Sequence, residues 1–206
     1  MRLRSGPVTT VLLAVIAVVF AVELKNGVVH SDAVLYAMGA LTHDALRPGH
    51  YWRLLAAMFL HANWLHVLAN SWSLYQLGTA YENLFGSRRF LIIYFVTGLC
   101  ASVASSLMLP PHGIAVGASG AVLGILGAFI PSILRSPWRR ERWARSLIAQ
   151  LVFWALLNII LGFEVKEIDN TAHITGLVTG FLLGFAPQQI APRPPSEETL
   201  DVTPRT

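Results

Sequence analysis

Ser119 and His173 are the two residues of this chain whose types and positions could carry out covalent chemistry. Ser119 lies within Val116–Ala121 and His173 within Ala172–Gly176, and each begins an apolar stretch long enough to span a membrane. An ionisable side chain inside a bilayer is costly and is usually functional. Because a histidine can take the proton of an attacking serine, the pair predicts acyl-transfer chemistry such as peptide-bond hydrolysis.

Glycines indicate how the two residues could meet. Three follow each residue at helical spacing: Gly120, Gly124 and Gly127 after the serine, and Gly176, Gly180 and Gly184 after the histidine. Such ridges of small residues let membrane helices approach closely. Taken alone, Ser119 could also be a helix cap, and His173 a structural histidine bonded to a backbone carbonyl.

A third polar group precedes these two segments. It comprises His61, Asn63, His66, Asn70 and Ser73. The spacing of His66, Asn70 and Ser73 puts them on one helical face, where an amide and an imidazole N–H could stabilise an oxyanion together with the backbone N–H of Ser119. The alternative is a hydrogen-bond network that only packs helices. Glu82 is expected near the opposite end of the same helix, too far from these residues to act in catalysis. We expect it instead to bond neighbouring loop residues and fix the end of its helix.

Composition indicates the solvent that surrounds these residues. The chain has 206 residues, 54% of them hydrophobic and only 13% charged, whereas about a quarter is usual in soluble domains. Charge-free stretches predict an all-α membrane protein with six transmembrane helices at 7–24, 61–83, 90–108, 117–134, 145–163 and 171–187. They form one membrane domain over 1–187, and the Pro- and Glu-containing tail 188–206 is expected to be disordered and cytoplasmic.

Basic residues predict the orientation. With the N-terminus inside, 11 of the 15 Lys and Arg residues lie on the cytoplasmic side. Both chain ends are then cytoplasmic, and Ser119 and His173 lie near the extracytoplasmic ends of their helices. The same placement explains the net charge of +4 without a nucleic-acid partner. The first apolar run has no small-x-small site after Val22, which favours a retained helix over a cleaved signal peptide.

Other proteolytic chemistries lack their residues. A zinc protease helix carries His-Glu-x-x-His, but His61 and His66 are five residues apart with no glutamate between them. An aspartyl protease needs two buried aspartates, and no aspartate lies within a predicted span. We therefore expect neither a metal nor a cofactor. The single cysteine, Cys100, excludes an internal disulfide.

From Trp52 to Gly184 the chain resembles the rhomboid family of intramembrane serine proteases. The matching pieces are Trp52-Arg53, His61, His66-x-x-x-Asn70, Glu82, Gly117-x-Ser119-Gly120 and Ala172-His173-x-x-Gly176-x-x-x-Gly180. One departure is visible four residues after the serine, where many members have an aromatic residue against the histidine and this chain has Leu123.

The resemblance implies a role for each matching residue. Ser119 would be the nucleophile, His173 the general base, and His66 and Asn70 the oxyanion hole. Trp52, Arg53, His61, Glu82 and the four glycines Gly117, Gly120, Gly176 and Gly180 would be structural.

The resemblance also implies the setting of the reaction. Substrates would be transmembrane segments of other proteins, and the six-helix form favours a bacterial plasma membrane. Activity should fall in mild acid, because a free histidine titrates near about 6.5 and must be neutral to act as a base. The alternatives are a non-catalytic rhomboid-like protein that binds membrane helices and a small transporter; no inverted repeat favours the latter.

Overall fold

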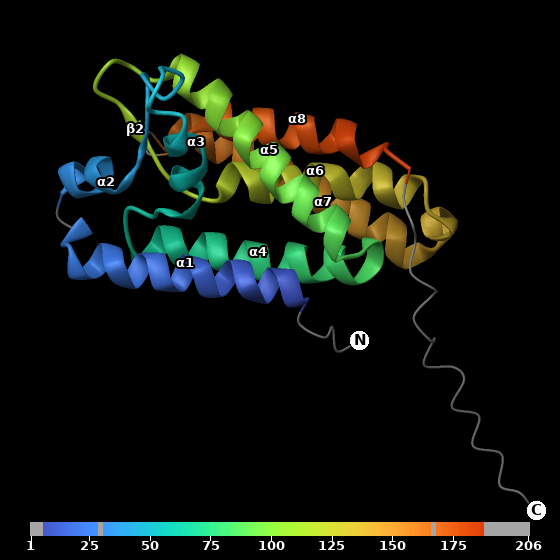
Figure 1. Cartoon of the computed structure of the whole chain (residues 1–206). Helices are drawn as coiled ribbons and strands as arrows, with labels where there is room; N and C mark the ends of the chain where they lie inside the picture. The colour runs from blue at the N-terminus through green and yellow to red at the C-terminus, as the bar shows by residue number, and fades with distance from the viewer. Residues whose placement is uncertain (1–5, 29–30, 166–167, 188–206) are drawn as a thin grey trace, which may run out of the picture.

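The computed structural model describes residues 6–28, 31–165 and 168–187. The predicted disordered tail, 188–206, lies outside the described residues. The long helices run side by side, and the shorter elements that precede residue 119 gather at one end of the bundle (Figure 1). The long helices are α1 (Pro7–Lys25), α4 (Trp64–Phe85), α5 (Ser87–Met108), α6 (Ser119–Leu134), α7 (Arg142–Glu164) and α8 (Asn170–Gly184). The short elements at that end are α2 (Asp32–Met38), β1 (Leu41–Thr42), α3 (Trp52–Ala56), the 3-10 turn η2 (Ala57–Phe59) and β2 (Ile114–Ala115). A further 3-10 turn, η3 (Pro137–Arg140), joins α6 to α7.

The helix boundaries differ from the predicted ones by a few residues, for local reasons. Helix α4 begins at Trp64 rather than at residue 61, because the Asn63 side chain caps it by accepting from the His66 N–H. His61 therefore precedes the helix instead of beginning it. Helix α6 begins at Ser119 rather than at residue 117, because Gly117 has a φ of +121°, which no helix contains.

Within the described residues, three helices, α1, α5 and α7, are long and apolar enough to cross a membrane. Helix α6 is apolar over 16 residues, slightly less than the usual span. The chain is thus an all-α protein with membrane-spanning helices. That α4, α6 and α8 also cross, and that both termini are cytoplasmic, stay predictions.

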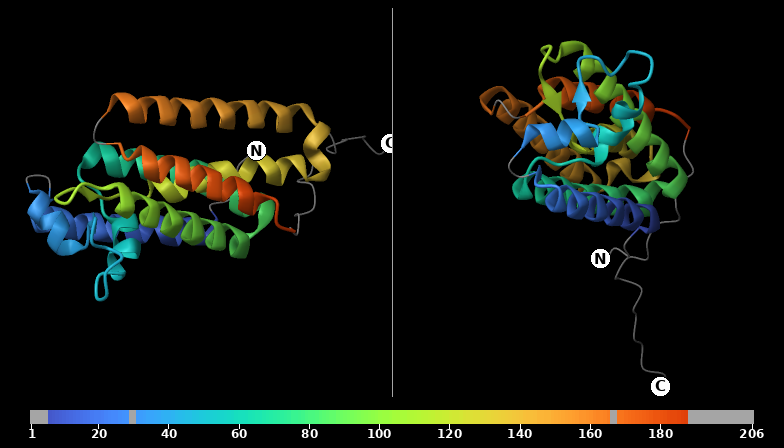
Figure 2. Two further views of the ribbon diagram at one scale, coloured as in Figure 1. Left: turned by 90° about the horizontal axis from the view of Figure 1, so that it is seen from above. Right: turned by 60° about the vertical axis from the view of Figure 1, so that its left-hand side comes forward.

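Helix α6 forms the centre of the bundle and α7 lies at its edge. Almost every residue of α6 from Gly120 to Ile133 is buried, in one apolar core with residues of α1, α4, α5 and α7. In α7 only Ala144, Leu151 and Ala155 are buried, and Figure 2 shows this helix beside the others rather than among them. The residues that precede and begin α6 are therefore held by neighbours on several sides.

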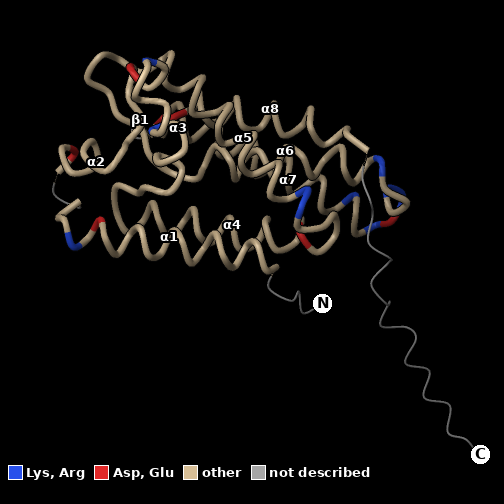
Figure 3. The backbone as a smooth tube through the Cα atoms, in the orientation of Figure 1, with Lys and Arg blue, Asp and Glu red and all other residues tan. Residues whose placement is uncertain are grey.

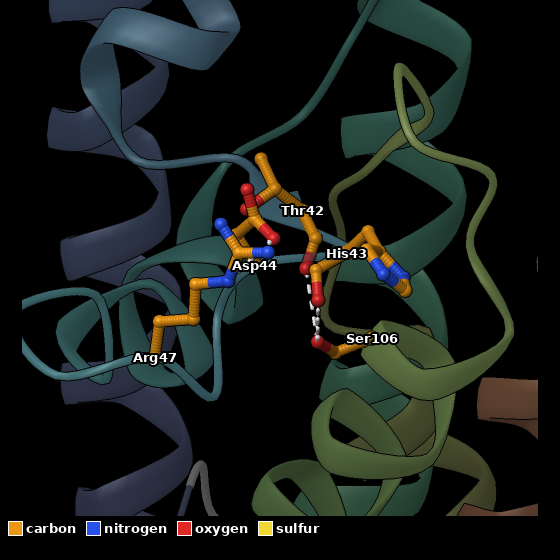
Figure 4. A network of polar contacts seen from close by, with 5 residues as sticks. All are labelled: Thr42, His43, Asp44, Arg47 and Ser106. Carbon is orange, nitrogen blue, oxygen red and sulfur yellow. Dashed lines mark hydrogen bonds and ion pairs between the residues drawn. The ribbon is translucent and has the colours of Figure 1, made fainter.

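At the end of the bundle that holds the short elements, contacts fix the segments before α3 and α6. Strands β1 and β2 pair antiparallel, with Leu41 opposite Ala115. The Ser106 hydroxyl at the end of α5 donates to the carbonyls of Thr42 at 2.9 Å and His43 at 3.4 Å, as Figure 4 shows. These contacts connect the segment around Leu41–His43, between α1 and α4, to α5 and to the strand that leads into Ser119.

Charged residues lie mainly towards the ends of the helices (Figure 3). At the end opposite the short elements, the Arg89 guanidinium donates to the Gly184 carbonyl at 3.0 Å and to those of Ala186 and Pro187 at 3.0 Å. It thereby satisfies carbonyls at the C-terminus of α8, which have no partner within the helix. Helix α8 is thus anchored to the beginning of α5.

Candidate active site

Ser119 is the first residue of α6 and follows a sharp turn. Gly117, two residues earlier, has a left-handed φ of +121° that side chains other than glycine rarely adopt, and its N–H donates to the Ala57 carbonyl at 2.9 Å. Within the described residues the Ser119 hydroxyl forms no hydrogen bond, and the N-cap Ala118 makes no side-chain cap. Capping of α6 therefore does not account for the serine.

Helices α6 and α8 touch along their glycine ridges. A Cβ on Gly176 would lie 2.9 Å from the carbonyl carbon of Gly120, and a Cβ on Gly180 would lie 2.6 Å from that of Gly124. These are closer than any ordinary carbon–carbon contact. Only glycine at these positions allows the two backbones to lie this close, as the ridges in the sequence suggested.

His173 lies in the first turn of α8, at the end where α6 begins. Its side chain is 6% exposed and its Nδ1 is buried without a hydrogen-bond partner. Ala172, the residue before it, packs on Gly120, the residue after Ser119. No hydrogen bond joins the Ser119 hydroxyl and His173 in the described part of the chain. Catalytic hydrogen bonds often tighten only when substrate binds, so the two residues can act as a pair without this bond in the free protein.

His66 and Asn70 of α4 are brought against the turn that precedes Ser119. A Cβ on Gly117 would lie 2.6 Å from Nε2 of His66 and 3.7 Å from Nδ2 of Asn70. The Asn70 amide also donates to the His66 carbonyl at 3.1 Å. The first N–H groups of a helix have no partner within it, so the Ser119 N–H and these two side chains offer donors at one place.

A small cavity of about 30 Å³ adjoins Ser119. Its wall includes Gly117, Ser102, Ser105, Asp169 and Ala172. A site of this size with polar walls has room for a water molecule.

Asp169, which the sequence prediction left without a role, fixes the beginning of α8. One carboxylate oxygen accepts from the Ala172 N–H at 3.0 Å, and the other accepts from the Ser105 hydroxyl. Its backbone carbonyl accepts from the His173 N–H at 3.1 Å. An aspartate directly before a helix is a recognisable cap signal, but the bond to α5 has no signature in the sequence.

The expected structural residues hold the surroundings of the site. Arg53 donates to the carbonyls of Tyr36 and Ala40, both at 2.8 Å, and its guanidinium lies over the rings of Tyr36 and Trp52. These bonds fasten α2 and the start of β1 to α3. Trp52 itself is half exposed and contributes mainly its ring face.

Glu82 bonds a partner that the sequence did not indicate. Its carboxylate accepts from the N–H groups of Val8 and Thr9 at 2.9 Å and from the hydroxyls of Thr9 and Ser87. It therefore caps the N-terminus of α1, where a negative charge is favourable. The prediction of bonds to neighbouring loop residues is wrong in its partners, because Ser87, the one bonded residue close by in the sequence, is the first residue of α5.

His61 is fully buried beside Glu23 of α1. Like Asp169, Glu23 has no role predicted from the sequence. The Glu23 carboxylate accepts from the His61 N–H at 2.8 Å, and the His61 ring packs edge-on against the His66 ring with centroids 5.1 Å apart. Burial, with a smaller contribution from His66, lowers the pKa of His61 to about 3. His61 is therefore neutral at physiological pH.

No group of three or more His, Cys, Asp or Glu side chains that could hold a metal ion occurs within residues 6–28, 31–165 and 168–187. The donors described above are instead distributed around a serine hydroxyl.

Leu123, at the position of the departure from the family pattern, is buried in the apolar core.

Comparison with known proteins finds one family. The Rhomboid domain model matches residues 48–189. The chain is 32% identical over 188 residues to the protein named "Putative rhomboid protease YdcA" of Bacillus subtilis, and the match covers 89% of each chain. It is 35% identical to "Rhomboid protease GluP" of the same bacterium over 81% of this chain, and 41% identical to "RHOMBOID-like protein 2" of Arabidopsis thaliana over 75% of it. The chain spans 32% of the length of GluP and 48% of that plant protein.

Proposed function

This chain belongs to the rhomboid family, and from that premise we propose that it is an intramembrane serine endopeptidase with Ser119 and His173 as its catalytic dyad. The observation that carries the proposal is the close contact of α6 and α8. It puts the first residue of one helix and the first turn of the other at the same end of the bundle. His66 and Asn70 lie beside Gly117, in the turn that precedes Ser119.

The reaction follows from these positions. The Ser119 oxygen attacks the carbonyl carbon of the substrate peptide bond while His173 takes the hydroxyl proton. The negative charge that develops on the carbonyl oxygen is stabilised by the His66 ring N–H, the Asn70 amide and the Ser119 N–H. His173 then gives its proton to the leaving amine, which releases the first product and leaves an acyl-enzyme.

Water completes the cycle. A water molecule in the cavity beside Ser119 would lose a proton to His173 as it attacks the acyl carbon, and Ser119 would recover its hydroxyl on release of the second product. The walls formed by Ser102, Ser105 and Asp169 offer hydrogen bonds to such a water.

The proposed substrates are transmembrane segments of other membrane proteins. We further infer that the site opens on the extracytoplasmic face, because the positive-inside rule puts the chain ends and most arginines on the cytoplasmic side. The proposed location is a bacterial plasma membrane, a setting compatible with the two Bacillus subtilis relatives.

Cleavage of a membrane reporter tests the proposal. The purified chain is reconstituted in liposomes with a tagged single-span substrate, and product is followed on gels for the wild type, Ser119→Ala and His173→Ala. We expect cleavage by the wild type only, with both variants retaining their helical circular dichroism. Cleavage by Ser119→Ala at the wild-type rate would rule out the proposed nucleophile.

The same experiment distinguishes the second candidate function, a non-catalytic rhomboid-like protein that binds membrane helices. Retention of both Ser119 and His173 argues against it. If the wild type captured the reporter without cutting it, and Ser119→Ala captured it equally well, this second function would replace the first.

A further inference from the structure

Glu23 is a buried carboxyl group near the end of α1, in a segment that the family model does not include. Its exposed fraction is 0%, and one of its oxygens, Oε1, accepts from the His61 N–H at 2.8 Å. The other, Oε2, is buried and has no hydrogen-bond partner. Among the described residues no lysine or arginine forms an ion pair with it. Such a group is costly within a membrane helix, and a functional role is the first explanation to test.

His61 connects this carboxyl to the candidate site. Its side chain is 0% exposed, and its Nδ1 lies 3.2 Å from the Phe59 carbonyl. A carbonyl only accepts hydrogen bonds, so the ring proton lies on Nδ1 and the buried Nε2 is an acceptor. Both ring orientation and backbone position of His61 are thus fixed, the first by Phe59 and the second by Glu23.

The ring of His61 in turn packs against His66. The two rings meet at 72° with centroids 5.1 Å apart, an edge-on geometry that restricts both. On its far side His66 directs Nε2 at Gly117, two residues before Ser119. A continuous set of contacts therefore runs from α1 through His61 and His66 to the turn that begins α6.

We propose that Glu23 is a positioning residue, which holds His61 and through it orients the His66 ring N–H towards the substrate oxyanion. The inference rests on the proposed function, and it gives the end of α1 that holds Glu23 a role in positioning the site. The hydrogen bond from the His61 N–H to Oε1 is the contact that carries the effect.

The other end of α1 provides a matched control. There Thr9, 1% exposed, donates from its N–H and its hydroxyl to Glu82 of α4. Thr9→Val removes a buried polar contact between helix and neighbour, as Glu23→Ala does, but at the end of the bundle away from Ser119. Loss of packing alone should affect both variants alike.

The experiment measures kcat and KM per active site. Wild type, Glu23→Ala, Glu23→Gln and Thr9→Val are titrated to completion with a fluorophosphonate that labels Ser119, and cleavage of the liposome reporter is divided by the labelled amount. This division removes any effect of an unfolded fraction. Removing an oxyanion donor costs about 100-fold or more in kcat, so its misorientation in Glu23→Ala should cost roughly tenfold with KM nearly unchanged. Glu23→Gln keeps the acceptor oxygen and should recover most of the rate, and Thr9→Val should match the wild type.

A second pair of variants decides the matter if Glu23→Ala does not fold. His61→Ala removes the ring that packs on His66 and should lower kcat per site about as much as Glu23→Ala, since the same donor is misoriented. His61→Phe keeps a ring there and should stay closer to the wild type.

Several results would overturn the inference. They are an unchanged kcat per site in Glu23→Ala, or in His61→Ala if that variant has to stand in, an equal loss in Thr9→Val, and a Glu23→Gln variant as slow as Glu23→Ala. Any of these, with an active wild type, would leave the proposed function standing. A wild type that neither labels nor cleaves would instead remove the proposed function and this inference together.

Discussion

Replacing Gly180 by alanine perturbs the contact on which the site depends. The new Cβ would lie 2.6 Å from the carbonyl carbon of Gly124 and 2.8 Å from its Cα, whereas carbon atoms in contact are about 3.5–4.0 Å apart. Both atoms belong to backbone inside helices and cannot rotate away. Helices α6 and α8 must therefore separate by roughly 1 Å at this point.

Two magnitudes follow from that displacement. Overpacking of a core costs about 1–3 kcal/mol, and alanine regains about 1 kcal/mol of helix propensity over glycine, so the net loss of unfolding free energy should be about 0–2 kcal/mol. The rate should suffer more, because a misplacement of about 1 Å in a catalytic constellation costs roughly 100-fold. We expect Gly180→Ala to fold and to cleave the reporter about two orders of magnitude more slowly per labelled Ser119.

Gly78→Ala is the control for this change. Gly78 also lies within a helix, but its Cβ would meet side-chain atoms only, Thr9 Oγ1 at 3.0 Å and Phe90 Cζ at 3.1 Å. Its thermal midpoint in detergent and its cleavage rate should stay near those of the wild type. A Gly180→Ala variant that cleaves as fast as Gly78→Ala would refute the argument that close approach of α6 and α8 builds the site.

Three further predictions concern residues that hold the bundle. His61 has a pKa of about 3 in the folded protein, below the 6.5 of a free histidine. Between these two pH values the unfolded chain therefore binds a proton that the folded chain does not. The free energy of unfolding should then fall by up to about 1.4 kcal/mol per pH unit as the pH drops from 6.5 towards 3. His61→Phe should remove the contribution of His61 to the slope of the thermal midpoint against pH. An unchanged slope would show that His61 is not buried in its neutral form. Asp169→Ala should lose about 1 kcal/mol of stability with its helix cap and lower kcat, whereas Asp169→Asn, which still accepts hydrogen bonds, should lose less; equal values would exclude the cap as the cause. Arg89→Ala should lower the unfolding free energy by about 2 kcal/mol, since it removes charge-assisted bonds to the end of α8, and the exposed neighbour Arg88 gives a control whose replacement should have no effect.

Much of this architecture can be predicted from the sequence because two strong signals coincide. Charge-free stretches mark apolar helices to within a few residues, since charged groups are excluded from the bilayer interior. Offsets of 3, 7 and 11 after His173 put Gly176, Gly180 and Gly184 on one face, and the structure packs that face on α6. Local periodicity was therefore sufficient to identify which surfaces meet.

What the sequence does not reveal depends on contacts between distant segments. Glu23 follows an apolar run and stands two residues before Lys25, where it resembles any charged residue that marks a membrane boundary. Only the fold shows it buried against His61. The pairing of β1 with β2 involves two residues on each side, too few for an alternating pattern. The turn at Gly117 likewise needed the backbone angle to show why His66 can approach it so closely.

The proposed nucleophile is Ser119, activated by His173. Its most direct test is labelling of the full chain in detergent with a fluorophosphonate, followed by mass spectrometry of the labelled peptide. We predict a single adduct on Ser119, none in Ser119→Ala, and labelling of His173→Ala slowed at least about 100-fold, as loss of a general base requires. An adduct on another serine, or a His173→Ala variant that labels at the wild-type rate, would contradict the proposed dyad.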